Sequence, residues 1–381
     1  MSSWLVPASL YIHIPFCQAK CHYCSFNSYP AQESLHAPYL KAVKKELVLQ
    51  KNKLSQSTQL RTIFFGGGTP AVIGVDGVIE LLSSVLDCFR IAENCEISIE
   101  TNPELLEIKD YQKLVQSGIN RLSIGIQSFI DTELALLGRI HSASKAEKAY
   151  EMARMAGFDN INLDLMYGIP GQTPGSWVRS ITVATKLNPE HLSLYQLSIE
   201  EGTEFENRWK NKLISLPSEE EISSMDRLTK ELCPPPYEQY EISNYARGER
   251  RCKHNITYWK NHAYLGVGAG AVSYIDGVRM KNIEVPRAYC EHLKEPSLPV
   301  ANSERLERYE SFKETVIMGL RLREGVELGS LKARYNLTIT EVYTTVLDKL
   351  LAGDMLRVTD THLQLTERGW SVSNLVMADL V

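Results

Sequence analysis

The sequence lacks the features that mark membrane, exported and nucleic-acid-binding proteins. No apolar stretch approaches the ~20 residues that a membrane span needs, and no basic-then-apolar signal pattern precedes the first strand-like segment. The formal net charge of −5 provides no general attraction to nucleic acid. Eight cysteines in 381 residues suit a reducing compartment better than a disulfide framework. We therefore expect a cytoplasmic protein without a transmembrane segment or a nucleic-acid partner.

Three of the eight cysteines lie close together. Cys17, Cys21 and Cys24 have a CxxxCxxC spacing and follow an apolar, strand-like run at residues 10–14. No fourth cysteine lies nearby in the sequence, and three thiolates can ligate three irons of a [4Fe-4S] cube while the fourth iron stays open to another ligand. A zinc site is the alternative, and it would need a fourth donor such as a nearby histidine, His13 or His22.

The first two hundred residues alternate strand-like and helix-like segments, which form six β/α units. The strand-like segments occupy residues 10–14, 62–65, 96–100, 122–127, 161–166 and 191–197. This alternation predicts an α/β fold in which a parallel sheet has helices outside it. Right-handed crossovers would curl such a sheet into a barrel or a partial barrel.

Polar residues follow the ends of these strands. Residues 66–69, Glu100, Gln127 and Asp164 all lie at or just past a predicted carboxyl end, where parallel β/α folds place their active sites. Successive glycines allow a backbone to approach a ligand closely, although a plain glycine turn is the alternative. The motifs GxGxxG and GxxxxGK(S/T) are absent, which argues against dinucleotide and P-loop sites. We therefore expect one ligand site at this edge of the sheet.

The chain divides into three predicted parts. We expect a core partial barrel at residues 1–205, an accessory α/β region at 206–300 and a mainly helical domain at 301–381. The last part shows helical patterns followed by a hairpin near residues 355–365, and it resembles a winged-helix-like module. DNA binding is an alternative for this module, but acidic residues outnumber basic ones from Gly325 onward.

Five motifs connect this pattern to a known group of proteins. YIHIPFC at residues 11–17 and GGGTP at 66–70 resemble the oxygen-independent coproporphyrinogen III oxidase group of radical S-adenosylmethionine (SAM) proteins. ETNP at 100–103, RLSIGIQS at 121–128 and DLMYGIPGQT at 164–173 resemble the same group. The resemblance implies a radical SAM partial (β/α)6 barrel, in which the amino and carboxylate groups of SAM hold the open iron.

The resemblance also implies roles for individual residues. The expected ligands of the [4Fe-4S] cluster are Cys17, Cys21 and Cys24, flanked by Tyr11 and Tyr23. The residues expected at the amino-acid end of SAM are Gly67, Gly68 and Thr69. Those expected at the amino group, ribose or carboxylate of SAM are Glu100, Gln127, Arg139 and Asp164.

Two features separate the branches of this group. The oxidases have a further cysteine two residues after the third one and an N-terminal extension, whereas this sequence has Phe26 and a short segment before its first strand. It also contains HNxxYW at residues 254–259, which is typical of the haem chaperone HemW family. The resemblance therefore implies a haem chaperone that carries a [4Fe-4S] cluster and SAM and passes haem to an acceptor protein. The alternative is an enzyme, a SAM-dependent, oxygen-independent coproporphyrinogen III dehydrogenase.

The chemistry of HNxxYW suits haem. A neutral imidazole such as that of His254 is a usual axial ligand of haem iron, tyrosinate at Tyr258 is another, and Tyr258 with Trp259 offers a flat apolar surface. The alternative is a structural role, in which His254 and Asn255 hydrogen-bond a loop beside the barrel while the aromatic side chains pack. The residues alone leave both interpretations open, and the family resemblance favours haem binding at His254 and Tyr258.

Overall fold

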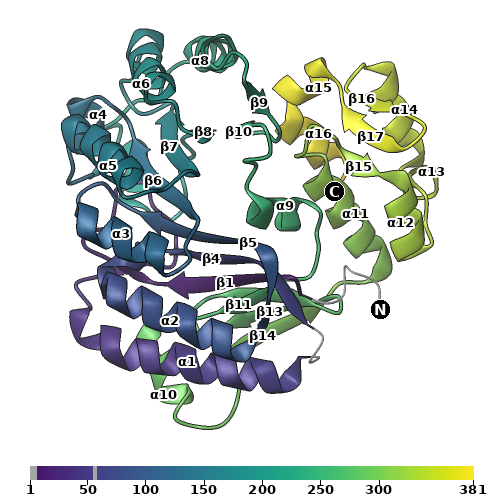
Figure 1. The fold of residues 1–381 in the computed structure, drawn as a ribbon. Helices are drawn as coiled ribbons and strands as arrows, with labels where there is room; N and C mark the ends of the chain where they lie inside the picture. The colour runs from purple at the N-terminus through teal and green to yellow at the C-terminus, as the bar shows by residue number, and fades with distance from the viewer. Residues whose placement is uncertain (1–6, 55–57) are drawn as a thin grey trace.

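The computed structural model describes residues 7–54 and 58–381. A curved sheet of nine strands dominates it, in the order β11-β1-β4-β5-β6-β7-β8-β10-β9 (Figure 1). Its six central strands run parallel to one another. They are β1 (Ser9–Ile14), β4 (Gln59–Gly67), β5 (Arg90–Thr101), β6 (Arg121–Gln127), β7 (Ile161–Tyr167) and β8 (His191–Gln196). The predicted partial (β/α)6 barrel is confirmed.

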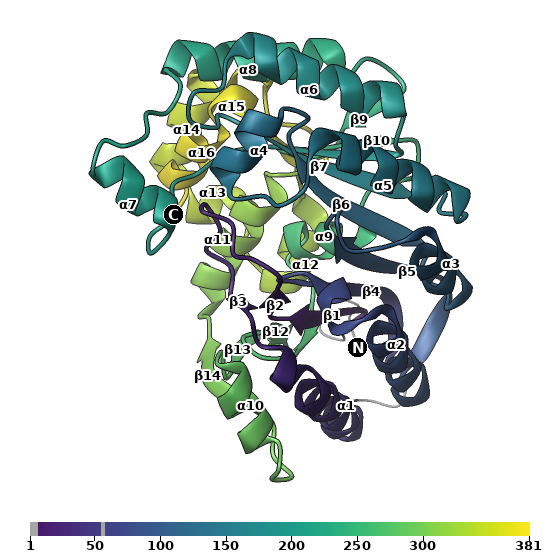
Figure 2. The same cartoon turned by 90° about the vertical axis from the view of Figure 1, so that its left-hand side faces the viewer.

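Helices cover the outer face of these strands, and Figure 2 shows α1 beside α2 and α6 beside α8. Leu10, Ile12 and Ile14 alternate along β1 and are fully buried in the core that also contains Val43 and Leu47 of α1. Tyr11 and His13, between them in the strand, line a cavity on the inner face. The covering helices are α1 (His36–Lys53), α2 (Val75–Cys88), α3 (Ile108–Gln116), α4 (Asp131–Leu137), α5 (Ala143–Met155), α6 (Pro174–Leu187) and α8 (Glu219–Leu232).

The ends of α6 illustrate how local sequence sets the length of these helices. A capping box begins the helix: the side chain of Thr173 accepts a hydrogen bond from the backbone N–H of Ser176, and the side chain of Ser176 accepts one from the backbone N–H of Thr173. Pro174 takes the first helical position, where its missing N–H costs nothing. The helix ends at Leu187, and the capping residue after it, Asn188, adopts a left-handed conformation with φ 59°.

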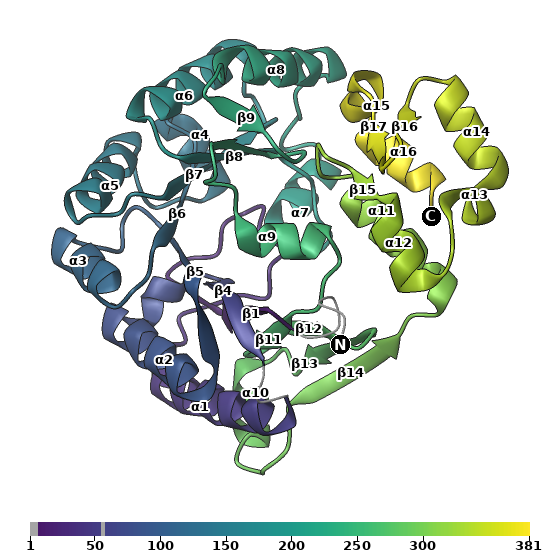
Figure 3. The same cartoon turned by 45° about the vertical axis from the view of Figure 1, so that its right-hand side comes forward.

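The middle of the chain completes both edges of the sheet. β10 (Asn244–Arg247) pairs antiparallel with β8 and with β9 (Tyr237–Gln239), while β11 (Leu265–Val267) pairs parallel with β1. Between them, α9 (Lys253–Trp259) lies inside the curve of the sheet (Figure 3). Further elements of this region are α7 (Glu204–Lys210), β12 (Val272–Ile275), β13 (Val278–Asn282), α10 (Pro286–His292) and β14 (Val300–Arg305); β12, β13 and β14 form a separate antiparallel sheet.

The C-terminal region has a hydrophobic core of its own, which includes Phe312, Val316, Leu347 and Leu363. The predicted hairpin is confirmed, since β16 (Leu356–Val358) and β17 (His362–Leu365) pair antiparallel. The other elements are α11 (Arg308–Gly319), β15 (Val326–Glu327), α12 (Leu328–Tyr335), α13 (Ile339–Val342), α14 (Thr344–Ala352), α15 (Glu367–Ser371) and α16 (Ser373–Asp379). Across residues 7–54 and 58–381, no helix is long and apolar enough to cross a bilayer.

Candidate functional site

The three motif cysteines follow the carboxyl end of β1. Cys17 ends β2 (Phe16–Cys17), and Cys21 and Cys24 lie on the segment between β2 and β3 (Tyr29–Pro30). Cys17, Cys21 and Cys24 all line one cavity of about 630 Å³, which we call the cysteine cavity. Burial raises the pKa of the Cys17 and Cys24 thiols, and the neighbouring cysteines raise it further. Three thiolates would therefore repel one another here unless a positively charged group lay between them.

Two histidines near the cysteines are already bound to protein groups. The Nδ1–H of His22 donates to the carbonyl of Leu136 at 2.8 Å. His13 donates its Nε2–H to the carbonyl of Asn27 at 2.9 Å, so its Nδ1 accepts the hydroxyl proton of Tyr11, also at 2.9 Å. Both ring nitrogens of His13 are thus engaged, and the zinc alternative is left to metal analysis of the protein.

The glycine turn after β4 forms the wall beside the first cysteine. Gly67 has φ +117°, a conformation that side chains rarely allow. A Cβ atom on Gly68 would lie 2.5 Å from the carbonyl oxygen of Phe16 and 2.9 Å from Cys17 Sγ. Thr69 Oγ1 donates to the same sulfur at 3.8 Å. The turn therefore brings backbone amides and carbonyls close to Cys17, as a site for a large bound group requires.

Two carboxyl groups lie on neighbouring parts of the cavity wall. Glu100 Oε2 accepts from the Gly67 amide at 3.3 Å, and burial with the nearby charge of Asp164 raises the pKa of Glu100 to about 8. Asp164 accepts from Ser123 Oγ at 2.9 Å and from Asn162 Nδ2 at 2.8 Å, and burial raises its pKa. A cationic ligand would stabilise the ionised form of both carboxyl groups. This part of the site therefore suits an ammonium group or a set of hydroxyl donors.

Arg139 points into the cysteine cavity. Its Nη1 donates to Cys21 Sγ at 3.4 Å, and its Nη2 donates to Asn102 Oδ1 at 2.7 Å and to the Gly125 carbonyl at 2.6 Å. Its positive charge can offset a thiolate or bind a carboxylate. Asn102 was not expected as a site residue, although it follows β5 directly and belongs to the ETNP stretch at residues 100–103 that carries the family resemblance.

Gln127 ends β6 in a positive-φ conformation (φ 71°) and is 5% exposed. Its Oε1 accepts from the phenol of Tyr195, a β8 residue that sequence reasoning also missed. Tyr23 packs against Phe205 of α7 with ring centroids 6.4 Å apart. The structure thus brings together eleven of the twelve residues expected at the cluster or SAM, while Tyr11 lines adjacent cavities. The eleven are Cys17, Cys21, Tyr23, Cys24, Gly67, Gly68, Thr69, Glu100, Gln127, Arg139 and Asp164.

A second cavity of about 640 Å³ lies next to the first, and we call it the aromatic cavity. Its walls come from β1, the segment after Cys24, α9, β12, β13 and α11. It shares Phe26, Gly67, Glu100 and Trp259 with the cysteine cavity, so the two adjoin. Its aromatic lining residues are Tyr11, Phe26, Tyr258, Trp259, Tyr264 and Tyr274.

His254 lies behind the wall of the aromatic cavity and does not present a free nitrogen. Its Nδ1 bonds Thr62 Oγ1 at 2.7 Å and its Nε2 bonds the Tyr258 hydroxyl at 2.8 Å, while its ring stacks on Phe64. The residue is 1% exposed, and burial lowers its pKa to about 3, which keeps the imidazole neutral. Both ring nitrogens of His254 are therefore engaged by Thr62 of β4 and by Tyr258. Direct ligation of haem iron by His254 stays a prediction.

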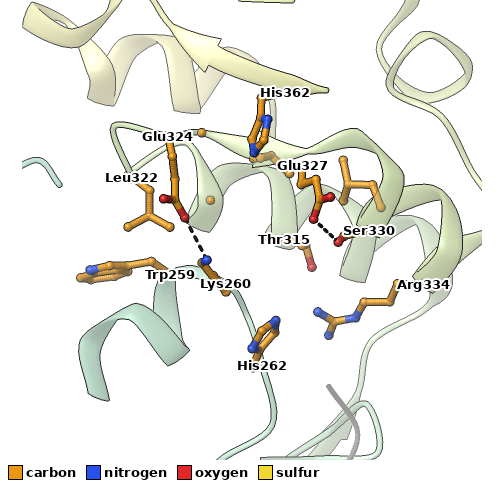
Figure 4. A pocket seen from close by; sticks show the side chains of 14 residues that line it. Trp259, Lys260, His262, Thr315, Leu322, Glu324, Glu327, Ser330, Arg334 and His362 are labelled. Atoms are coloured by element: carbon orange, nitrogen blue, oxygen red, sulfur yellow. Dashed lines mark hydrogen bonds and ion pairs between the residues drawn. The ribbon is translucent and has the colours of Figure 1, made fainter. Parts of the chain in front are cut away.

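Trp259 and Lys260 connect this site to the C-terminal region. The guanidinium of Arg321 lies 4.3 Å over the indole ring of Trp259. Trp259 and Lys260 also line a small cavity of about 190 Å³ together with residues of the C-terminal region, and in this cavity Lys260 pairs with Glu324 at 2.9 Å (Figure 4). The C-terminal region therefore supports α9 directly, and with it the wall that both larger cavities share.

Comparison with known proteins finds relatives over nearly the whole chain. Residues 11–184 match the model of the Radical SAM superfamily, and residues 306–372 match that of the HemN C-terminal domain. A protein of Bacillus subtilis (strain 168) named Heme chaperone HemW is 35% identical, over 97% of this chain and 97% of its own. The Heme chaperone HemW of Escherichia coli (strain K12) is 37% identical, over 75% of this chain and 76% of its own.

One solved structure has the same fold over the full length. Coproporphyrinogen III oxidase (HemN) from Escherichia coli, described as a radical SAM enzyme, superposes with a TM-score of 0.85 over 99% of this chain and 90% of its own. The two sequences are 23% identical. At that identity the likeness shows the radical SAM fold, which confirms the predicted fold class, and carries no argument about activity.

Proposed function

This chain belongs to the haem chaperone HemW family of radical SAM proteins, and from that premise we propose that it binds haem and transfers it to an acceptor protein. One observation carries the proposal. The HNxxYW segment places Tyr258 and Trp259 on the wall of a cavity with six aromatic side chains, and this cavity adjoins the cysteine cavity. A volume of about 640 Å³ and an aromatic lining suit a large, flat, largely apolar ligand such as a porphyrin.

The cofactors of this family are a [4Fe-4S] cluster and SAM, and the residues of the cysteine cavity fit both. The thiols of Cys17, Cys21 and Cys24 are soft donors, and the cradle at Gly68 has no room for a side chain beside Cys17. When bound, the reduced cluster supplies the electron that cleaves SAM. We propose that Arg139 offsets thiolate charge at Cys21 through its 3.4 Å contact.

The polar wall of the cysteine cavity would bind the rest of SAM. Gly67, Gly68 and Thr69 offer backbone and hydroxyl groups to its amino-acid end. Glu100 and Asp164 offer acceptors for an ammonium group or ribose hydroxyls, and a cation beside Glu100 would release the proton that its raised pKa retains. Gln127 is held in place by the Tyr195 phenol, which leaves its amide nitrogen as a donor.

We further propose that Tyr258 is the side chain of HNxxYW that meets haem directly, with His254 as its positioning partner. Tyr258 lines the aromatic cavity, whereas His254 is buried behind it and bonds the phenol oxygen at 2.8 Å. A neutral imidazole at this distance can accept a hydrogen bond from the phenol and fix its orientation, while burial raises the pKa of Tyr258 and keeps the phenol neutral until an iron ion stabilises its ionised form. Tyr258→Phe would then alter the visible spectrum of ferric haem bound to the protein.

The acceptor and the location stay predictions: a haem-acceptor protein of unknown identity, in the cytoplasm. The enzyme alternative has one specific obstacle, which is that Phe26 offers no thiol where the resembling oxidases have one. Phe26 is 66% exposed and borders both cavities, so its side chain is positioned for contact with a ligand and not for metal binding.

Two parallel assays test the proposal. The reconstituted chain is titrated anaerobically with haem, and separately incubated with coproporphyrinogen III, SAM and a reductant. We expect stoichiometric haem binding and transfer to an apo-haemoprotein, with little or no decarboxylation. Robust conversion to protoporphyrinogen IX together with no haem binding would overturn the chaperone function and support the dehydrogenase.

A further inference from the structure

The aromatic cavity has a basic edge that no sequence motif indicated. Arg279 and Lys281 lie two residues apart on β13, so their side chains share one face of the small sheet. Across the β12-β13 pair, Arg279 stands opposite Tyr274 and Lys281 opposite Val272, and all four line the aromatic cavity. Their Cα atoms are about 7 Å apart at the usual rise of a strand. Two cations therefore stand side by side along one edge of an aromatic chamber.

Each of these cations currently pairs with a glutamate. Arg279 Nη2 pairs with Glu314 of α11, and Lys281 Nζ pairs with Glu284. The four side chains range from 25% to 53% exposed, and ion pairs at such exposure contribute little net stability. Another carboxylate can therefore replace either glutamate at a small cost, while the cation keeps a partner in both states.

We propose that Arg279 and Lys281 bind the two propionate carboxylates of haem, an inference that rests on the proposed haem function. The two propionates leave the same edge of the macrocycle, and the two cations lie along one edge of the cavity. With its propionates on β13, the ring lies against the wall that carries Tyr258 and Trp259. Charge-assisted bonds to carboxylates are the strong ones, and arginine makes them in a fixed geometry. Glu314 and Glu284 occupy these donors until haem displaces them.

The central experiment compares haem with its dimethyl ester, which keeps the ring and iron but has no carboxylates. Both ligands are titrated into the full chain and into a double variant, Arg279→Gln with Lys281→Gln. Loss of charge-assisted contacts should weaken haem binding about tenfold or more, and should leave the affinity for the dimethyl ester unchanged. Equal affinity of the double variant and the wild type for haem would overturn the proposal.

A second variant predicts an effect of the opposite sign. Glu314→Gln frees Arg279 from its competing carboxylate, while the new amide oxygen can still accept from Asn261 Nδ2, as Glu314 does at 3.2 Å. Haem affinity should rise several-fold, and ester affinity should not change. A purely structural role for the Arg279–Glu314 pair predicts instead that both variants lose stability and bind either ligand less well.

Arg305→Gln is the matched control. Arg305 lies on β14 of the same sheet, opposite Val278, and donates to the Asp276 carbonyl outside the cavity. The Arg305→Gln substitution removes one positive charge outside the proposed site, so the affinity for haem should not change. The outcomes also separate the two levels of inference. If the wild type binds haem and ester equally, the propionate site fails and haem binding stands; if it binds neither, the proposed function itself fails.

Discussion

The two cavities have nearly the same volume, about 630 and 640 Å³, yet they are built in opposite ways. The cysteine cavity combines one loop with the carboxyl ends of adjacent parallel strands, where thiol, carboxyl, amide and glycine groups converge. The aromatic cavity has walls from the start of the chain, the middle of the chain and α11 near its end, and six aromatic rings line it. The first is a product of sheet topology, and the second is a product of how distant segments pack.

This difference suggests a division of labour. Polar groups that are fixed by strand ends can bind a cofactor in one geometry. A chamber assembled from several segments can open when one of them moves, as delivery of a cargo requires. α9 belongs to both cavities through Trp259, and the C-terminal region contacts it through the Lys260–Glu324 pair and through Arg321.

The largest expected effect is a loss of the cluster from the cysteine cavity that leaves the aromatic cavity unchanged. Replacing any one of Cys17, Cys21 or Cys24 by alanine should abolish the [4Fe-4S] cluster, because two thiolates cannot hold the cube with one iron already unsupported. Haem binding in the aromatic cavity should persist. Iron and sulfide analysis together with the visible spectrum measures the cluster content, and haem titration of the same sample measures haem binding. Cys88→Ser, at the end of α2, is the control. Zinc instead of iron in the anaerobic wild type would contradict the assignment.

The next effect tests the wall behind the aromatic cavity. His254→Ala leaves the buried Thr62 and Tyr258 hydroxyls without their partner and removes a ring stacked on Phe64. We expect the free energy of unfolding to fall by about 2 to 4 kcal/mol and haem binding to weaken, while the cluster and SAM affinity survive. Tyr258→Phe should weaken haem binding or change its spectrum with a smaller loss of stability. Unchanged haem binding in both variants would show that HNxxYW is not part of the haem site.

A smaller effect on SAM binding is expected at Asp164, in the middle of β7. Asp164→Ala removes the acceptor that Ser123 and Asn162 hold in place, so SAM binding should weaken about tenfold while the cluster absorption stays intact. Equilibrium titration of the reconstituted protein with SAM measures this. Asp159→Asn, an exposed carboxylate paired with Arg250, is the control and should bind SAM as the wild type does. Equal affinities of the Asp164→Ala variant and the wild type for SAM would show that Asp164 does not contribute to the SAM site.

The two cavities also differ in how far sequence could predict them. Glu100 and Gln127 were predictable because they lie at the carboxyl ends of β5 and β6, and parallel strands bring these ends to one edge. Asp164 was expected at a strand end too, but it lies in the middle of β7 (Ile161–Tyr167) and lines the cavity from inside the curve of the sheet. The partners of these residues were not predictable: Asn102 bonds Arg139 across two separate loops, and no spacing reveals that contact. Arg139 itself was expected only from family resemblance.

The aromatic cavity was less accessible to sequence reasoning. Tyr258 and Trp259 stood out as part of a motif, but Tyr264 and Tyr274 are ordinary aromatic residues until β12 folds beside β11. The direction in which His254 points depends on Thr62 and Tyr258 together, so its buried, doubly bonded state is a tertiary property. A sequence pattern can show which residue types are present, and only packing decides which of their atoms stay free.

The smallest expected effect comes from Glu100, a residue that both cavities share. Its pKa is raised to about 8, chiefly by burial and then by Asp164, whereas the same carboxyl in the unfolded chain titrates near 4.5. Between these values the folded protein retains a proton that the unfolded chain has lost, so stability falls as pH rises from about 4.5 to about 8.

The Glu100→Gln substitution removes this contribution to the pH dependence of the free energy of unfolding. Without ligands the variant should match the wild type near pH 5 and exceed it near pH 8.5, by an amount of order 1 kcal/mol because the open cavities admit solvent. Urea unfolding at the two pH values measures the difference. Parallel pH profiles would mean that Glu100 is ionised throughout, and that the junction between the two cavities already carries a negative charge before any ligand binds.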